Sequence, residues 1–212
     1  MEPISSRTPR GLTGAGALPG NGIVSESSRN QFGAGSTGLT NIRAPSPRLR
    51  TSLRRRKRFV AEGGRVAING RDAVKLQAAA REIDPTGKKV VVVTGDVANP
   101  ATGIALIDAA VSRFGQLDML ANNAGVFTPK PFLELTEADY DWNLNAILKG
   151  SFFTAQAAAK AMKDRGGAIV QTGSMWAIQA IGATPSSAYS AAKAGVHALT
   201  RNLAIELERA AF

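Results

Sequence analysis

Hydrophobic and polar residues follow two alternating patterns between residues 58 and 208. Short, nearly continuous runs of β-branched and apolar residues, such as Lys89–Thr94 (KVVVVT), predict buried strands. Longer segments with apolar residues three and four positions apart, such as Ala101–Phe114, predict helices. The predicted strands are Arg65–Asn69, Lys89–Thr94, Leu117–Ala121 and Ala168–Thr172. The predicted helices are one that ends near Ala61, followed by Asp72–Ile83, Ala101–Phe114, Glu137–Lys163 and Ser187–Glu208.

This order of elements predicts the class of fold. Strands that alternate with helices of ten or more residues are typical of a doubly wound parallel sheet. We therefore expect residues 58–212 to form a Rossmann-like α/β domain. Because ligands of such sheets bind at the carboxyl ends of the strands, candidate functional residues are sought there.

Residues 1–57 differ from the rest of the chain in composition and in charge. They are rich in Gly, Ser, Pro and Arg without a sustained period of 2 or 3.6, so we predict a largely disordered leader. This leader carries ten basic and two acidic side chains, a net charge of +8. The remaining 155 residues carry 16 basic and 14 acidic side chains, so the high net charge of +10 belongs mainly to the leader.

The basic run 54–58 (RRRKR) is open to more than one interpretation. Such a run can bind nucleic acid or act as a targeting address. We favour the simpler interpretation, that it is the solvated start of the helix ending near Ala61. The acid-poor, Arg/Ser-rich leader also resembles an organellar transit peptide, but no clear amphipathic helix supports import. We therefore expect a cytoplasmic protein, with organellar import as the minority alternative, and we do not expect nucleic acid as a partner.

Composition argues against several other kinds of site. The chain has no cysteine, which excludes disulfides and thiolate metal sites. Its one histidine, His197, cannot form a multi-histidine metal site, and we interpret it as a packing residue of a helix. No apolar stretch approaches the roughly 20 residues that cross a bilayer, so we expect a soluble protein without a membrane partner.

The last predicted helix carries two residues that can cooperate in acid–base chemistry. Tyr189 and Lys193, in the segment YSAAK, are four positions apart and share one face of the helix. A tyrosine hydroxyl is a weak acid near neutral pH, and a neighbouring ammonium group favours its ionised form. This pair alone is weak evidence, because the same spacing occurs by chance in many helices.

Polar or small residues also follow three of the predicted strands. Asp96 and Val97 follow the second strand, Asn122–Gly125 (NNAG) ends the third, and Ser174 follows the fourth. The small residues of NNAG allow the backbone to approach a ligand closely. Because parallel strands end at one edge of the sheet, we expect these residues to lie near the helix of Tyr189.

Together these motifs resemble the short-chain dehydrogenase/reductase family in order and spacing over residues 58–208. The resemblance implies an oxidoreductase that transfers a hydride between a nicotinamide cofactor and an alcohol or carbonyl substrate. It implies that Tyr189 is the general acid/base, that Ser174 orients the substrate oxygen, and that Lys193 assists Tyr189 and binds the nicotinamide ribose. The other residues that it assigns to the cofactor site are Asp96, Val97, Asn123, Ala124 and Gly125.

The turn after Arg65–Asn69 indicates which nicotinamide cofactor is used. Proteins that bind NAD through this fold usually place an acidic residue there, for the ribose 2′-hydroxyl. Here the turn is Gly70-Arg71, and an arginine can pair with a 2′-phosphate. We therefore favour NADP(H), while the nearby Asp72 keeps NAD(H) possible.

The chain also departs from the family pattern. The resemblance implies a first strand and a glycine-rich turn before the helix ending near Ala61, but Thr13–Gly16 and Gly33–Gly38 match that turn poorly. We therefore predict that the first strand is missing, and likewise the strands that follow the last helix. Ile147 stands where the family has an asparagine, and we interpret Asn143, one turn earlier, as a surface residue. The alternative to an active enzyme is thus an inactive fragment or a faulty gene model.

The resemblance further implies a small alcohol or carbonyl substrate and a homo-dimer or tetramer. Family members associate through helices equivalent to Glu137–Lys163 and Ser187–Glu208, and the Ala-rich faces of these segments permit close packing. The loop that contains Met175, Trp176 and Ile178 can accommodate an apolar group of the substrate.

Overall fold

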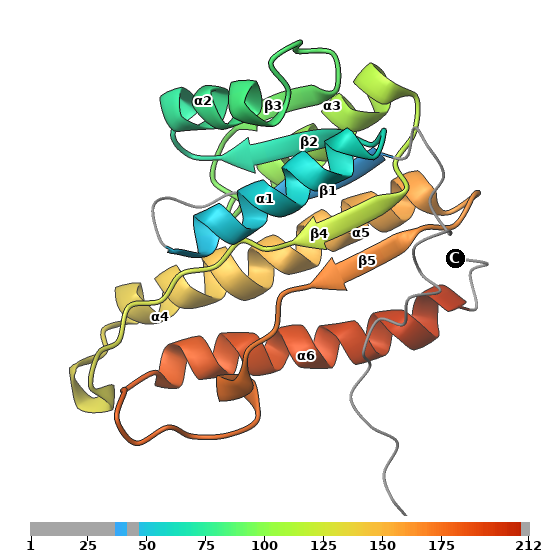
Figure 1. Cartoon of the computed structure of the whole chain (residues 1–212). Helices are drawn as coiled ribbons and strands as arrows, with labels where there is room; N and C mark the ends of the chain where they lie inside the picture. Colours follow the sequence, from blue (N-terminus) through green and yellow to red (C-terminus); the bar gives the residue numbers. More distant parts are fainter. Residues whose placement is uncertain (1–36, 42–46, 209–212) are drawn as a thin grey trace, which may run out of the picture. The chain divides into compact units, whose positions relative to one another are not determined.

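The computed structural model describes residues 37–41 and 47–208, with the backbone alone for 37–41 and 47–52. Its strands form one five-stranded parallel sheet in the order β3-β2-β1-β4-β5 (Figure 1). The strands are β1 (Thr37–Asn41), β2 (Arg65–Gly70), β3 (Val90–Thr94), β4 (Met119–Asn122) and β5 (Ala168–Gln171). The chain builds the sheet outward from β1 to β3 and then returns to the other side of β1, so the ligand crevice of this topology lies beyond β1 and β4.

The helices connect the strands, and their bounds lie close to those predicted. The α-helices are α1 (Pro47–Ala61), α2 (Ala73–Ile83), α3 (Pro100–Phe114), α4 (Glu137–Leu144), α5 (Gly150–Met162) and α6 (Ser187–Glu208). The shorter turns are η2 (Phe132–Glu134), η3 (Asn145–Lys149, a π-helix) and η4 (Met175–Ala177). The Rossmann-like parallel sheet predicted from the sequence is therefore confirmed. Among residues 37–41 and 47–208, β5 is the last strand and α6 the last helix.

Local sequence signals set the ends of the helices that flank the site. The Asp72 carboxylate caps α2 by accepting a hydrogen bond from the backbone N–H of Lys75 at 3.0 Å. Asn99 caps α3 in the same way, and Pro100 occupies the first turn, where no backbone donor is needed. Gly115 ends α3 with a φ of 84°, a conformation that glycine adopts without strain.

The structure contradicts the prediction that the first strand is missing. β1 pairs with β2 on one side, with Gly38 opposite Val66, and with β4 on the other, with Gly38 opposite Met119. The sequence of β1, TGLTN, contains a single apolar residue, so its hydrophobic pattern does not reveal a central strand. Main-chain hydrogen bonds to two neighbours, rather than side-chain pattern, place it in the sheet.

The prediction of a disordered leader is correspondingly wrong for part of its length. Residues 37–41 form β1, and residues 47–57 belong to α1. The rest of the leader, including Thr13–Gly16 and the first four residues of Gly33–Gly38, lies outside the described residues.

An apolar cluster covers each face of the sheet. Val66 and Ile68 of β2 pack with Val60 of α1 and with α2, whereas Ala67 between them packs with α3 and α5. Successive residues of a strand point to opposite faces, so this division shows that β2 is covered on both sides. Figure 1 shows α1 on one side of the sheet and α5 on the other. Full burial of one such aliphatic side chain stabilises the fold by about 1.5–3 kcal/mol.

The basic run of α1 is only partly solvated. Arg54 and Arg55 are exposed, as predicted, but Arg56 is 3% exposed, and burial lowers its pKa to about 10. Lys57 donates a hydrogen bond to Glu82 of α2 at 2.7 Å. The prediction that this run is solvated is therefore wrong for Arg56, which lies on the side of the helix that faces the core. Lys57 links α1 to α2.

The segment predicted as one helix, Glu137–Lys163, consists of α4, the π-helical turn η3 and α5. A wider turn of this kind realigns the residues that follow it and is frequent near functional sites. Gly150 begins α5 in close contact with the turn after β3, because a Cβ there would lie 3.0 Å from the Val97 carbonyl oxygen. Ile147 of η3 is fully buried in the cluster that contains Tyr189.

Candidate active site

Lys193 lies buried between the carboxyl ends of β4 and β5. Its side chain is on α6, only 4% of the residue is exposed, and its Nζ donates a hydrogen bond to the Thr172 carbonyl oxygen at 2.5 Å. The same Nζ lies 3.9 Å from the point that a Cβ on Gly125 would occupy. Thr172 in turn donates its N–H to the Asn122 carbonyl oxygen at 2.9 Å. A buried ammonium group is costly unless it is hydrogen-bonded, so these contacts fix the cation at the edge of the sheet.

Tyr189 lies one turn before Lys193 on the same face of α6 and is 3% exposed. Its ring makes T-shaped contacts with two aromatic rings, Phe127 at 5.0 Å and Trp176 at 5.5 Å between centroids. Phe127 and Trp176 stack on each other at 4.6 Å. These three rings, which we call the aromatic cluster, hold the tyrosine between the loop after β4 and the loop after β5. Phe127, which sequence reasoning missed, could have been found as the aromatic residue two positions after NNAG.

Ser174 follows β5 and is held by two hydrogen bonds. Its Oγ accepts from the backbone N–H of Trp176 at 3.3 Å. Its own backbone N–H donates to His197 Nε2, also at 3.3 Å. The histidine that was interpreted as a packing residue therefore also makes a polar contact with the candidate site.

A shallow hollow lies at the carboxyl ends of β2, β3 and β4. Asn69 lies in its lining, and its side-chain N–H groups are hydrogen-bonded to the carbonyl oxygens of Val93 and Gly95 at 2.9 and 3.2 Å. Asn69 is 1% exposed and links the ends of β2 and β3. Its position at the end of the strand Arg65–Asn69 did not predict this role. The residues that line the hollow are Asn69, Arg71, Gly95, Asp96, Val97, Ala124, Gly125 and Ala146.

Arg71 lies beside Asp96 at this hollow. The guanidinium is 3.6 Å from the Asp96 carboxylate and 5.3 Å from the centroid of the Trp142 ring. Both side chains of the ion pair are about two-fifths exposed, at 42% and 41%, so water screens it and its energy is small. The Asp96 carboxylate therefore holds the guanidinium only weakly.

The structure brings the predicted site residues together. Ser174, Tyr189 and Lys193 surround the ends of β4 and β5, and Gly125 belongs both to this group and to the lining of the hollow. Asn123 is connected to the same place, because its Oδ1 accepts a hydrogen bond from the Thr172 hydroxyl at 3.2 Å.

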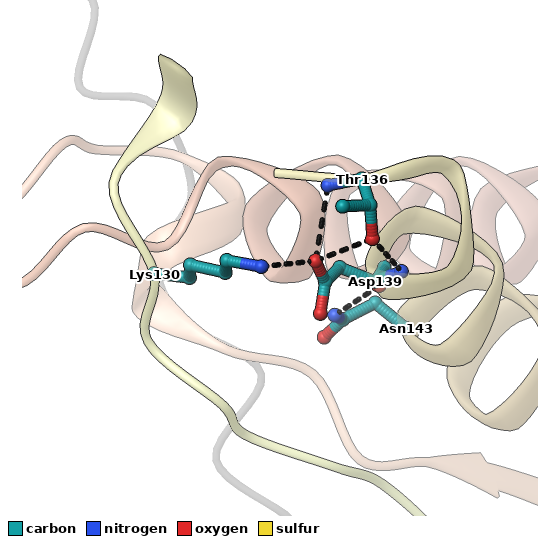
Figure 2. Close-up of polar contacts among 4 residues, drawn as sticks. All are labelled: Lys130, Thr136, Asp139 and Asn143. Atoms are coloured by element: carbon teal, nitrogen blue, oxygen red, sulfur yellow. Dashed lines mark hydrogen bonds and ion pairs between the residues drawn. The ribbon is translucent and has the colours of Figure 1, made fainter. Parts of the chain in front are cut away.

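A polar network fastens the loop after β4 to the start of α4. Figure 2 shows Lys130 Nζ donating to Asp139 Oδ2 at 2.6 Å. Thr136 and Asp139 form a capping box, in which each side chain binds the backbone N–H of the other. Because Lys130 lies three residues after Phe127, this network limits the movement of the loop that carries part of the aromatic cluster.

Asn143 belongs to the same network and is buried, contrary to the prediction of a surface residue. It is 2% exposed, and its amide donates to the Asp139 carbonyl oxygen at 2.8 Å (Figure 2). Its Oδ1 is buried without a partner among the described residues. Asn143 lies one turn before the buried Ile147, on the side of α4 that packs against α6. The polarity of Asn143 alone gave no sign of this burial.

The Asp139 network predicts a pH-dependent contribution to stability. Hydrogen bonds, first from Lys130 and then from Thr136, hold the pKa of the Asp139 carboxyl well below its usual range. A carboxyl whose pKa is lower in the folded state stabilises the fold above its unfolded pKa, about 3.9, and that stability is lost as pH falls toward the folded pKa. Asp139→Asn should therefore cost stability at neutral pH and progressively less below about pH 4.

Urea denaturation of the wild type and Asp139→Asn across this pH range measures the effect. Asp141→Asn, which removes an exposed carboxylate from the same helix, is the matched control. A difference between wild type and Asp139→Asn that stays constant with pH would contradict the assignment.

In the described part of the chain, no three His, Asp or Glu side chains gather in a way that could hold a metal ion. Likewise, none of the helices in that part combines the length and the apolar composition needed to cross a membrane.

Comparisons with known proteins agree with this geometry. Residues 54–211 match the family model described as short chain dehydrogenase. A dehydrogenase subunit from Thauera aromatica, named for (2S)-[(R)-hydroxy(phenyl)methyl]succinyl-CoA, is 39% identical over 154 residues, covering 72% of this chain and 61% of the relative. A Mycobacterium tuberculosis reductase, named for a hexahydroindene-carboxyl-CoA, is 34% identical over 206 residues, covering 95% of this chain and 70% of the relative.

Solved structures show the same likeness in three dimensions. A short-chain dehydrogenase/reductase from Serratia marcescens superposes with a TM-score of 0.74 at 30% identity, over 83% of this chain and 70% of that one. The chain spans only 58–61% of the length of several curated relatives. The family model and the relatives nevertheless cover most of this sequence, and the chain belongs to the short-chain dehydrogenase/reductase family.

Proposed function

We propose that this chain carries the catalytic centre of an oxidoreductase that interconverts an alcohol and a carbonyl compound with NADP(H). The observation that supports it most is the place of Lys193. A buried ammonium group, hydrogen-bonded to Thr172 and close to Gly125, stands at the carboxyl ends of two neighbouring strands, with Tyr189 one turn away. A core that served stability alone would have no need of a buried cation there, because burying a charge is unfavourable.

The proposed roles follow from this arrangement. The bound cofactor supplies the hydride in reduction and accepts it in oxidation. Tyr189 donates a proton to the carbonyl oxygen during reduction and takes it back during oxidation. Ser174 donates a hydrogen bond to the same oxygen, and the positive charge of Lys193 stabilises the phenolate that Tyr189 leaves behind.

We assign the adenosine end of a nicotinamide cofactor to the hollow beside this centre. Ala124 and Gly125 present no large side chain to the hollow, and Asp96 and Val97 lie on the side of β3. Small residues at strand ends permit the close approach that a dinucleotide requires. The exposed Arg71 provides a cation for a 2′-phosphate, which would compete with Asp96 for it.

Replacement of Arg71 by Met is expected to change the choice of nucleotide. A charge-assisted hydrogen bond contributes about 1.5–3 kcal/mol, so the affinity for NADPH should fall by about tenfold or more. The affinity for NADH, which has no 2′-phosphate, should change little. Parallel fluorescence titrations with both nucleotides measure the ratio.

Arg81→Met is the matched control for this prediction. Arg81 is an exposed arginine in the last turn of α2, and α2 begins at the carboxyl edge and runs away from it. Equal losses of NADPH and NADH affinity in Arg71→Met would overturn the preference for NADP(H).

The substrate is proposed only as a class, a small alcohol or carbonyl compound with an apolar part. Phe127, Met175 and Ile178 are exposed apolar side chains on the two loops that flank Tyr189. The relatives are named for substrates that range from an aromatic CoA ester to the sugar L-rhamnose, so they do not narrow the class further. We also propose that the chain forms a homo-dimer or tetramer. Two exposed aromatic side chains on α5, Phe152 and Phe153, support this proposal because a partner subunit would bury them.

Turnover tests the proposal. The purified chain is incubated with NADPH and a panel of aromatic and aliphatic ketones, and loss of the reduced nicotinamide absorbance is followed. Reduction of any member that depends on Tyr189 supports the proposal. A folded chain that binds neither nucleotide and reduces none of the panel would favour the inactive alternative. That alternative is motivated by the sequence at 42–46, which contains no glycine for a pyrophosphate-binding turn.

A further inference from the structure

Two side chains of α6, one helical turn apart, bind the backbone of the loop after β5. Lys193 and His197 are four positions apart, so they share one face of the helix. Lys193 Nζ donates to the Thr172 carbonyl oxygen, and His197 Nε2 accepts from the Ser174 N–H at 3.3 Å. The two contacts lie on either side of Gly173, so the helix binds a carbonyl and an N–H of the same short segment.

Gly173 makes this contact possible. A Cβ at this position would lie only 2.3 Å from His197 Nε2, closer than any side-chain contact tolerates. The loop therefore approaches the imidazole so closely that any larger residue would push the two apart. The same Cβ would lie 3.1 Å from Cδ2 and 3.4 Å from Cε1 of His197, so the edge of the ring that carries Nε2 faces the loop.

The direction of the hydrogen bond fixes the chemical state of the ring. An imidazole nitrogen accepts a hydrogen bond only when it carries no proton, and the imidazolium ion has no acceptor. His197 must therefore be neutral, with its proton on Nδ1, for the contact to exist.

We propose that His197 is a positioning residue that holds the loop of Ser174 in register with Tyr189 and Lys193. It does not touch the reacting atoms, and its effect reaches them through the backbone of Ser174. Because Ser174 Oγ also accepts from the Trp176 N–H at 3.3 Å, the hydroxyl is oriented from both sides of its own residue. The role in catalysis rests on the proposed function, whereas the hydrogen bond itself does not.

The tautomer of His197 is the first test, and it needs no turnover. The chain has a single histidine, so a long-range proton–nitrogen NMR correlation of the labelled chain contains one ring. We expect Nε2 to resonate as an unprotonated nitrogen and Nδ1 as a protonated one at neutral pH. A ring protonated on Nε2 at neutral pH would overturn the proposal.

Hydrogen exchange of the Ser174 amide is the second test. A typical hydrogen bond contributes about 1 kcal/mol, so His197→Leu should speed exchange of this amide about fivefold. His197→Gln, whose side-chain oxygen can accept a hydrogen bond, should restore part of the protection. Arg201→Leu, at an exposed position one turn later on α6, is the matched control and should leave the amide unchanged. Equal Ser174 exchange in His197→Leu and the wild type would overturn the proposal.

Gly173→Ala provides an independent variant if His197→Leu fails to fold. The added methyl should displace Ser174 from the ring, which should speed its amide exchange and shift the Nε2 resonance. An unchanged Nε2 resonance would count against the contact. NADPH binding is measured on the same samples, and its absence together with the expected tautomer would reject the proposed function while leaving the His197 contact established.

Discussion

Tyr189→Phe should remove carbonyl reduction and leave NADPH binding within about twofold of the wild type. The change deletes one hydroxyl and keeps the ring, so the aromatic cluster with Phe127 and Trp176 can persist. General acid–base catalysis contributes about 10²–10⁴-fold to a rate, and we expect a loss of that size in kcat. Steady-state kinetics and a nucleotide titration on the same preparation measure both quantities.

Tyr140→Phe is a matched control for this experiment. It removes the hydroxyl of the chain's only other tyrosine, which is 49% exposed on α4. Its turnover should equal that of the wild type. If Tyr189→Phe retained full turnover, Tyr189 would not be the acid/base, and the proton would have to come from another group.

Lys193→Met is expected to impair both activity and stability. Methionine has a similar length but no charge, so the tyrosine loses its neighbouring cation and the Thr172 carbonyl loses its donor. A hydrogen bond from a charged donor contributes about 1.5–3 kcal/mol, and turnover should fall at least 10²-fold, the lower end of the range for acid–base catalysis. NADPH affinity should fall as well, because the proposed contact with the nicotinamide ribose is removed.

Lys160→Met, at an exposed lysine of α5, separates a local effect from a general loss of charge. Urea denaturation gives the free energy of unfolding of each variant, and turnover is measured under native conditions. Normal turnover in Lys193→Met would show that the buried cation serves packing only.

The position of the candidate residues at one edge of the sheet could be predicted because it depends on topology alone. Parallel strands end at one edge of a sheet, so Asp96, Gly125 and Ser174 come together once the alternation of strands and helices is recognised. The i,i+4 spacing of Tyr189 and Lys193 then places both on the face of α6 that meets this edge.

Features that depend on contacts between distant segments could not be predicted in this way. β1 is held by main-chain pairing with β2 and β4, and its five residues carry almost no hydrophobic signal. The acceptor role of His197 depends on a residue 23 positions earlier in the chain. Asn143 is buried because α4 packs against α6, and its polarity suggested the opposite.

The surroundings of Arg71 could be predicted from the sequence only in part. The sequence identified Arg71 as the residue at the turn after β2, and the structure places it beside Asp96 at the hollow. The stacking of its guanidinium over Trp142, which lies 71 positions later, could not be read from the turn itself. This second contact holds the cation near the hollow whether or not the ion pair with Asp96 forms.

The central claim is that the edge of the sheet around Lys193 is a working nicotinamide site. A fluorescence titration of the purified 212-residue chain with NADPH, with NADH in parallel, tests this claim most directly. We expect saturable binding in the micromolar range that is tighter for NADPH and is weakened by Lys193→Met. The absence of saturable binding from a folded sample would contradict the claim, because the motifs would then be inherited without being assembled into a cofactor site.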